Sequence, residues 1–137
     1  MKPQPMVVPF WSPEEVEAAI NGTLAHLAAG KVLAYPTETV YGFGGAVDER
    51  SVQQLVSLKG RAPGKPFLLL VARSEMITRL GLHLTGYASM LAAKFWPGPL
   101  TLLVEASTGV PLKVTAHTGN VALRWPKSPI IRTSRAI

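Results

Sequence analysis

Apolar and polar residues follow one another in blocks that predict alternating helices and strands. Ser12-Pro13-Glu14-Glu15 has the form of a helix start with a capping box, and apolar residues then recur at helical spacing as far as Gly30. Two continuous apolar runs, 31–35 and 67–72, have the length of buried strands. Further helices are expected to begin at Asp48, Ser74 and Thr85, and further strands are expected over 100–105 and 120–125.

This alternation predicts an α/β domain, or an α+β domain if the sheet is mixed. We expect a twisted, largely covered mixed sheet with flanking helices. The 137 residues fit one domain over 1–137, with enough chain to bury a core. The helix after Asp48 is expected to bury Val52, Leu55, Val56 and Leu58, and the segment 107–119 is expected to be a loop.

The run from Tyr35 to Gly45 interrupts the pattern at the end of the first predicted strand. It combines a proline, three glycines and the hydroxyl side chains of Thr37, Thr39 and Tyr41. Loops that leave strands commonly bind ligands in α/β proteins, and these hydroxyls suit a carboxylate, an amine or another hydroxyl. The alternative is a tight turn in which the threonines satisfy nearby backbone groups. Composition alone does not decide between the two.

A second polar segment, Lys59-Gly60-Arg61-Ala62-Pro63-Gly64-Lys65-Pro66, places three cations among glycines and prolines. In an extended chain Lys59 and Arg61 share one face and can reach the same polyanion. Guanidinium and ammonium groups both bind phosphate, although the surrounding sequence is not a P-loop. The alternative is a solvent-exposed helix end, where cations suit the helix dipole.

Two polar side chains, Thr101 and Arg124, stand in strands that are otherwise apolar. An arginine in such a place needs a partner, either a buried carboxylate or a bound anion. The sequence contains no evident pair of nucleophile and base and no paired carboxylates, so the catalytic residues stay unassigned. This favours positioning and electrostatic catalysis on a substrate that brings its own reactive phosphate.

The formal net charge of +6 favours anionic partners such as nucleotides or nucleic acid. All eight acidic residues lie at or before Glu105, so the rest of the chain is either an anion-binding face or a solvated basic tail. The absence of cysteine excludes disulfides and thiolate metal sites and fits a reducing cytoplasm. The three histidines are too scattered for a metal motif. No apolar run approaches the roughly 20 residues of a membrane span, so we expect a cytoplasmic protein without membrane contact.

Four motifs, in a fixed order along the chain, resemble those of a known family. They are Pro36-Thr37-Glu38-Thr39-Val40-Tyr41-Gly42, Leu58-Lys59-Gly60-Arg61 followed by Lys65-Pro66, Phe95-Trp96-Pro97-Gly98-Pro99-Leu100-Thr101, and Val121-Ala122-Leu123-Arg124-Trp125-Pro126. Together they are similar to the YrdC/TsaC family, the threonylcarbamoyl-AMP synthases, over roughly residues 12–128.

The resemblance implies an enzyme that condenses L-threonine, bicarbonate and ATP into threonylcarbamoyl-adenylate and releases pyrophosphate, with Mg²⁺ accompanying the ATP. The threonylcarbamoyl group would then pass, through partner proteins, to adenosine 37 of tRNA. The implied fold is a twisted α/β sheet around a concave basic cleft. The nucleotide phosphates would be bound by Lys59, Arg61 and Lys65. The threonine pocket would be lined by Thr37, Thr39, Tyr41, Thr101 and Arg124.

Members of this family usually continue past the last of these motifs into a helix, another strand and a Ser-x-Asn motif. This sequence ends at Ile137 without that motif. We therefore expect a single YrdC-like domain that lacks the usual C-terminal helix and strand region. A partner chain could fill the gap, and a homodimer is one such arrangement. The alternative to a synthase is a module that binds double-stranded RNA or tRNA without catalysis, which the positive charge also favours.

Overall fold

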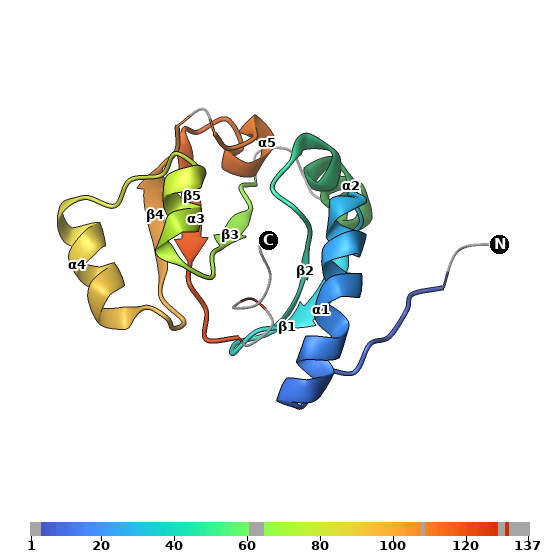
Figure 1. Cartoon of the computed structure of the whole chain (residues 1–137). Coiled ribbons are helices and arrows are strands. Elements are labelled where there is room, and N and C mark those ends of the chain that lie inside the picture. Colours follow the sequence, from blue (N-terminus) through green and yellow to red (C-terminus); the bar gives the residue numbers. More distant parts are fainter. Residues whose placement is uncertain (1–3, 61–64, 108, 129–130, 132–137) are drawn as a thin grey trace.

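The computed structural model describes residues 4–60, 65–107, 109–128 and 131. It has the predicted alternation of helices and strands, and the predicted mixed α/β architecture with flanking helices is confirmed (Figure 1). The elements in chain order are α1 (Pro13–Ala28), β1 (Leu33–Pro36), β2 (Tyr41–Gly44), α2 (Glu49–Lys59), β3 (Leu68–Leu70), α3 (Ser74–Arg79), α4 (Gly86–Phe95), β4 (Thr101–Glu105), α5 (Leu112–Thr115) and β5 (Asn120–Arg124).

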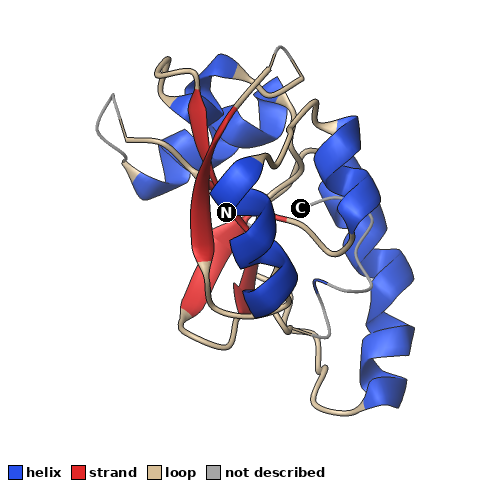
Figure 2. Cartoon of the chain, turned by 90° about the vertical axis from the view of Figure 1, so that its left-hand side faces the viewer, coloured by secondary structure: helices blue, strands red, loops and turns tan. Residues whose placement is uncertain are grey.

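The strands form two sheets. β1 and β2 make an antiparallel hairpin that pairs Leu33 with Gly44 and Pro36 with Tyr41. The second sheet has the order β3-β5-β4, in which β3 runs parallel and β4 antiparallel to the central strand β5. Figure 1 shows α1 and α2 beside the hairpin and α4 on the side of the three-stranded sheet that is remote from it, and Figure 2 shows the chain from the side of α4.

The first two helices begin where their capping residues predict. Ser12 Oγ accepts a hydrogen bond from the Glu15 amide at 3.2 Å, and the Glu15 carboxylate accepts one from the Ser12 amide at 3.2 Å, which completes the capping box of α1. Asp48 caps α2 in a similar way, and α2 ends at Gly60 with a left-handed φ of 54°. The expectation that Leu58 is buried was wrong. Its side chain is 57% exposed because only the first turns of α2 pack against the core.

Two segments that we expected to be loops contain regular structure. The second part of the Tyr35–Gly45 run contains strand β2, because the turn at 37–40 reverses the chain and returns it along β1. The segment 107–119 contains the short helix α5, which follows Pro111 at a φ of −54°. The candidate ligand loop is therefore only the tip of a hairpin.

The two faces of the three-stranded sheet differ in burial. Leu102, Val104, Val121 and Leu123 point into the main hydrophobic core, where α3 and α4 also contribute buried side chains. On the opposite face Leu103 is 70% exposed. Arg124 lies on that second face, because it pairs with Thr101 two positions before Leu103 along β4. This open face is turned toward the hairpin, and the candidate site lies between them.

Replacing Gly44 with alanine is expected to destabilise the hairpin. A Cβ at Gly44 would lie 2.6 Å from Tyr35 Cε1, whereas a Cβ at Gly42 meets nothing within 4 Å. We expect Gly44→Ala to lower the free energy of unfolding by about 1–3 kcal/mol, as an overpacked side chain does. Gly42→Ala is the matched control and should change it by less than about 0.5 kcal/mol. Urea denaturation measures both, and equal values for the two variants would show that Tyr35 moves aside without cost.

Candidate functional site

The tip of the β1–β2 hairpin is held by a hydroxyl. Thr37 Oγ1 accepts hydrogen bonds from the amides of Thr39 and Val40, each at 3.2 Å, and donates to the Val40 carbonyl at 2.8 Å. Its distance to Thr39 Oγ1 is 2.9 Å. Because the single hydroxyl proton of Thr37 is used on Val40, Thr39 is the donor of that last bond. The interpretation of the threonines as turn-stabilising residues is therefore correct for Thr37.

Arg124 connects this turn to the three-stranded sheet. Its Nε donates to Thr101 Oγ1 at 2.9 Å, and its Nη1 donates to Thr39 Oγ1 at 3.3 Å. Within the described part of the chain Arg124 has no carboxylate partner, so two neutral hydroxyls orient a full positive charge that is only partly exposed. A guanidinium has five N–H donors, and those not used on hydroxyls can meet the oxygens of an anion.

The structure thus brings four of the predicted site residues together: Thr37, Thr39, Thr101 and Arg124. A chain of hydrogen bonds runs from Arg124 through Thr39 to Thr37 and ends on the Val40 carbonyl. Tyr41 lies next to this group, opposite Pro36 on the hairpin, with its side chain 69% exposed. None of the hydrogen bonds found among the described residues joins Tyr41 to the group.

Of the predicted phosphate-binding cations, those that the structure describes lie beside the end of β3 that is remote from Arg124. Lys59 ends α2 with its Nζ 6.0 Å from the centre of the Phe67 ring, and the exposed Lys65 precedes β3. Leu70, at the other end of β3, is the residue level with Arg124. Leu70 lies three residues after Phe67 along an extended chain, which corresponds to about 10 Å. The lysines and Arg124 therefore lie at opposite ends of β3, and Arg61 lies outside the described residues.

The larger of two hollows near the hairpin adjoins Thr37. It has a volume of about 270 Å³ and is lined by Phe10, Trp11, Pro36, Thr37, Glu38, Lys127 and Ser128. The Lys127 amide donates to Glu38 Oε1 at 3.4 Å across it. Sequence reasoning missed Phe10 and Trp11. In the sequence they stand only as an aromatic pair directly before a helix cap. Such a pair follows no periodic pattern, so it does not indicate a site.

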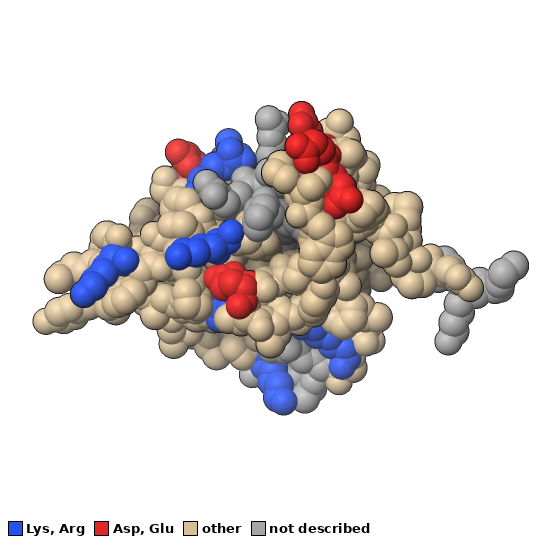
Figure 3. Space-filling model, turned by 90° about the horizontal axis from the view of Figure 1, so that it is seen from below, with Lys and Arg blue, Asp and Glu red and all other residues tan. Residues whose placement is uncertain are grey.

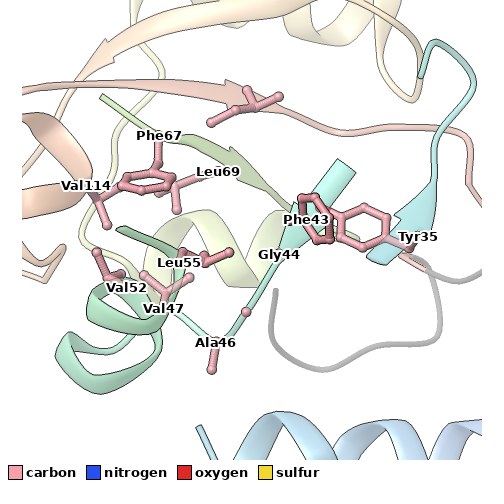
Figure 4. A pocket seen from close by; sticks show the side chains of 12 residues that line it. Tyr35, Phe43, Gly44, Ala46, Val47, Val52, Leu55, Phe67, Leu69 and Val114 are labelled. Carbon is pink, nitrogen blue, oxygen red and sulfur yellow. The ribbon is translucent and has the colours of Figure 1, made fainter. Parts of the chain in front are cut away.

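The other hollow is small and apolar. It measures about 50 Å³ and lies between the hairpin, α2, β3 and α5, with Tyr35, Phe43, Val52, Phe67 and Val114 among its walls (Figure 4). Apart from the Tyr35 hydroxyl its side chains offer no polar group, so it is a packing gap between the two sheets and not a place for chemistry.

Because of Tyr35, the free energy of unfolding is expected to fall at alkaline pH. Burial raises the pKa of its hydroxyl to about 12, above the value of about 10 for an unfolded tyrosine. The folded chain holds the proton more tightly, so this contribution is complete below about pH 10 and is lost as the pH rises through about 12. We expect a loss of about 2–3 kcal/mol over that interval.

The measurement is urea denaturation at about pH 9 and about pH 12 for the unchanged chain and for Tyr35→Phe. Both lose the same lysine charges, so the difference between their losses isolates the tyrosine. An identical loss in the two chains would mean that Tyr35 is hydrated in the folded state.

On one face of the molecule, positive and negative side chains are interspersed. Seen from below, lysine and arginine side chains lie at separate places with acidic side chains between some of them (Figure 3). The histidines, aspartates and glutamates that the structure describes form no group of three that could hold a metal ion. None of the described helices is long and apolar enough to cross a membrane.

These features define an α/β domain in which hydroxyls orient an arginine between two sheets. The chain belongs to the Sua5/YciO/YrdC family, whose model, described as "Telomere recombination", matches residues 25–133. It is 42% identical over 102 residues to a threonylcarbamoyl-AMP synthase of Pyrococcus abyssi, which covers 74% of this chain and 30% of that protein. It is 40% identical over 116 residues to the synthase of Thiobacillus denitrificans, covering 81% of this chain and 60% of that protein.

The solved structure of P. abyssi Sua5 complexed with L-threonine superposes with a TM-score of 0.78 at 35% identity, over 89% of this chain and 35% of that one. The resemblance predicted from the four motifs is thus confirmed at the level of the family. This chain spans between 30% and 60% of the length of the two synthases.

Proposed function

We propose that this chain is a threonylcarbamoyl-AMP synthase domain, which joins L-threonine, bicarbonate and ATP into threonylcarbamoyl-adenylate with release of pyrophosphate. The names of its relatives support this, as does the threonine complex of P. abyssi Sua5. The observation that carries the proposal is Arg124, a cation that hydroxyls from both sheets aim into the space between them.

In this proposal Arg124 binds the carboxylate of threonine or a phosphate oxygen, with Thr37, Thr39, Tyr41 and Thr101 around the amino acid. A guanidinium that hydroxyls already hold in place does not have to reorient when negative charge develops beside it. Preorganised sites stabilise transition states in this way. The remaining rate acceleration would come from positioning the threonine carbamate against the reacting phosphate of ATP.

The ATP phosphates are proposed to lie toward Lys59, Arg61 and Lys65. Mg²⁺ would arrive with the ATP, since it is usually held by substrate phosphates and water together with few protein ligands. When bound it would neutralise phosphate charge during the displacement. The further steps, transfer to adenosine 37 of tRNA through partner proteins in the cytoplasm, belong to the same proposal.

The test is threonine-dependent release of pyrophosphate from ATP in bicarbonate buffer. Release that requires threonine and falls in Lys59→Ala would support the proposal. Lys94→Ala, which removes an exposed lysine of α4, is the matched control and should leave the rate unchanged. A chain that releases no pyrophosphate and whose melting temperature responds to neither threonine nor ATP would overturn the proposal.

Binding of double-stranded RNA or tRNA without catalysis remains the second candidate, favoured by the net charge of +6. RNA affinity of this kind falls steeply with salt and tolerates single substitutions, whereas a nucleotide pocket loses its ligand when one residue changes. Titration of a short RNA duplex at two salt concentrations, with and without Lys59→Ala, separates the two.

A homodimer is also proposed. The helix α4 leaves four large apolar side chains exposed, which a second copy could cover. They are Tyr87, Met90, Leu91 and Phe95. Sedimentation velocity of the full chain tests this, and a monomer at all concentrations would exclude it.

A further inference from the structure

The turn that leads from α4 into β4 is held by backbone hydrogen bonds on both sides. The Trp96 amide donates to the Ala92 carbonyl at 3.0 Å, which anchors the start of the turn on the last turn of α4. The Gly98 amide donates to the Trp125 carbonyl at 2.8 Å, which joins the middle of the turn to the residue directly after Arg124. The turn therefore connects the end of α4 to the end of the central strand β5.

A third hydrogen bond in this turn comes from a side chain. The indole Nε1 of Trp96 donates to the Leu100 carbonyl at 2.7 Å, and the ring is partly buried against the main hydrophobic core. Because the Leu100 carbonyl and the Thr101 amide belong to one planar peptide unit, this bond fixes the direction in which the chain enters Thr101. Of the three bonds, only that of the indole depends on the identity of a side chain.

Thr101 stands where its strand is most easily disturbed. It is the first residue of β4, it pairs with Arg124 at the last position of β5, and it is exposed. The ends of such elements open more readily than their centres. Thr101 Oγ1 nevertheless accepts a hydrogen bond from Arg124 Nε at 2.9 Å. A rotation of the Leu100–Thr101 peptide would turn this hydroxyl away, and Arg124 would lose the shorter of its two hydroxyl contacts.

We propose that Trp96 is a positioning residue for Arg124, which acts through the Leu100–Thr101 peptide and the Thr101 hydroxyl. The proposal rests on the proposed function, since it explains how the arginine of that site keeps its orientation. The indole makes no contact with the ligand in this proposal. Its single N–H donor is used on Leu100, and its ring lines neither of the two hollows described above. Trp96 thus supports the guanidinium from the hydrophobic core.

The test compares Trp96→Phe with Trp125→Phe in the full chain. Phenylalanine keeps an aromatic ring against the core but lacks the N–H donor. Trp125 is the matched control, because it is also partly buried against the core, and none of the hydrogen bonds found among the described residues uses its indole. Its carbonyl can still accept from Gly98 after the substitution.

The direct readout is the exchange of the Arg124 Nε–H proton with water, in a proton–nitrogen spectrum of the arginine side chains assigned with Arg124→Met. We expect exchange about 3- to 10-fold faster in Trp96→Phe, the local opening that the loss of one hydrogen bond allows. The rate should not change in Trp125→Phe. The backbone amides of β5 should exchange as in the unchanged chain, because the effect is confined to the orientation of one side chain.

Threonine-dependent pyrophosphate release gives the second readout. We expect Trp96→Phe to lower kcat/KM for threonine about 3- to 10-fold, in line with the loss of one oriented hydrogen bond. In a chain that already carries Arg124→Met it should cause no further loss, since no guanidinium is left to position. If Trp96→Phe does not fold, benzothienylalanine at position 96 replaces it, because a sulfur atom then takes the place of the N–H in a ring of the same shape.

Three results would overturn the inference: equal exchange of the Arg124 proton in the two phenylalanine variants, faster exchange of the β5 amides together with it, or additive losses of Trp96→Phe and Arg124→Met. A chain without pyrophosphate release, whose melting temperature responds to neither threonine nor ATP, overturns the proposed function instead. The exchange rates then still decide whether Trp96 orients Arg124.

Discussion

Arg124→Met is expected to lower threonine-dependent pyrophosphate release on the order of 100-fold, the effect of removing one donor from a preorganised anion site. Methionine keeps the length and apolar character of the arginine stem but cannot donate to Thr101, to Thr39 or to a ligand. The loss should therefore appear in catalysis and in threonine affinity, while the chain stays folded.

Steady-state kinetics of pyrophosphate release, together with thermal melting in the presence and absence of threonine, measure this effect. Arg79→Met on α3 is the control, because it removes an exposed arginine from another part of the fold. Thr101→Val tests the orientation of the guanidinium separately and should give a smaller loss, since the charge remains. Activity in Arg124→Met that stays within a factor of two of the unchanged chain would remove Arg124 from the site.

Leu123→Ala is expected to have the largest effect on stability. Leu123 lies in the central strand β5, is 0% exposed, and packs between buried residues of both neighbouring strands. Truncation of such a leucine leaves a cavity and costs about 2–5 kcal/mol, a large share of the roughly 5–15 kcal/mol that stabilises a typical domain.

Leu103→Ala makes the same change on the other face of the same sheet. Leu103 is 70% exposed, and we expect its truncation to change the free energy of unfolding by less than about 0.5 kcal/mol. Urea denaturation of the two variants gives the comparison. Similar losses would mean that the face toward the hairpin is covered in solution, for example by a second copy of the chain.

The helices could be predicted from the sequence because their signals are local. Ser12, Glu15 and Asp48 cap their helices within three or four residues, so no distant contact is needed to recognise them. Strand β2 was missed because two of its four residues are glycines, which have low strand propensity, and it forms only by pairing with β1.

The candidate site was predictable as a set of residues and not as an arrangement. The apolar surroundings of Arg124 showed that it needs a partner. Its partners, however, are hydroxyls that lie 23 and 85 residues away in the sequence, and no local pattern relates positions at such separations. The hollow beside Thr37 could not be predicted for the same reason, since Trp11, Glu38 and Lys127 line it together only in the folded chain.

Arg124 also links the hairpin to the three-stranded sheet. None of the backbone hydrogen bonds found among the described residues joins the hairpin to the three-stranded sheet. The Arg124–Thr39 contact is therefore one of few polar links across the boundary between the two sheets, called here the seam. An anion bound at Arg124 between the two sheets would need them to stay at the separation that the Arg124–Thr39 hydrogen bond sets. Substitutions that loosen the seam should therefore weaken ligand affinity before they lower the melting temperature, and ligand screening will detect defects in assembly that a stability assay passes over.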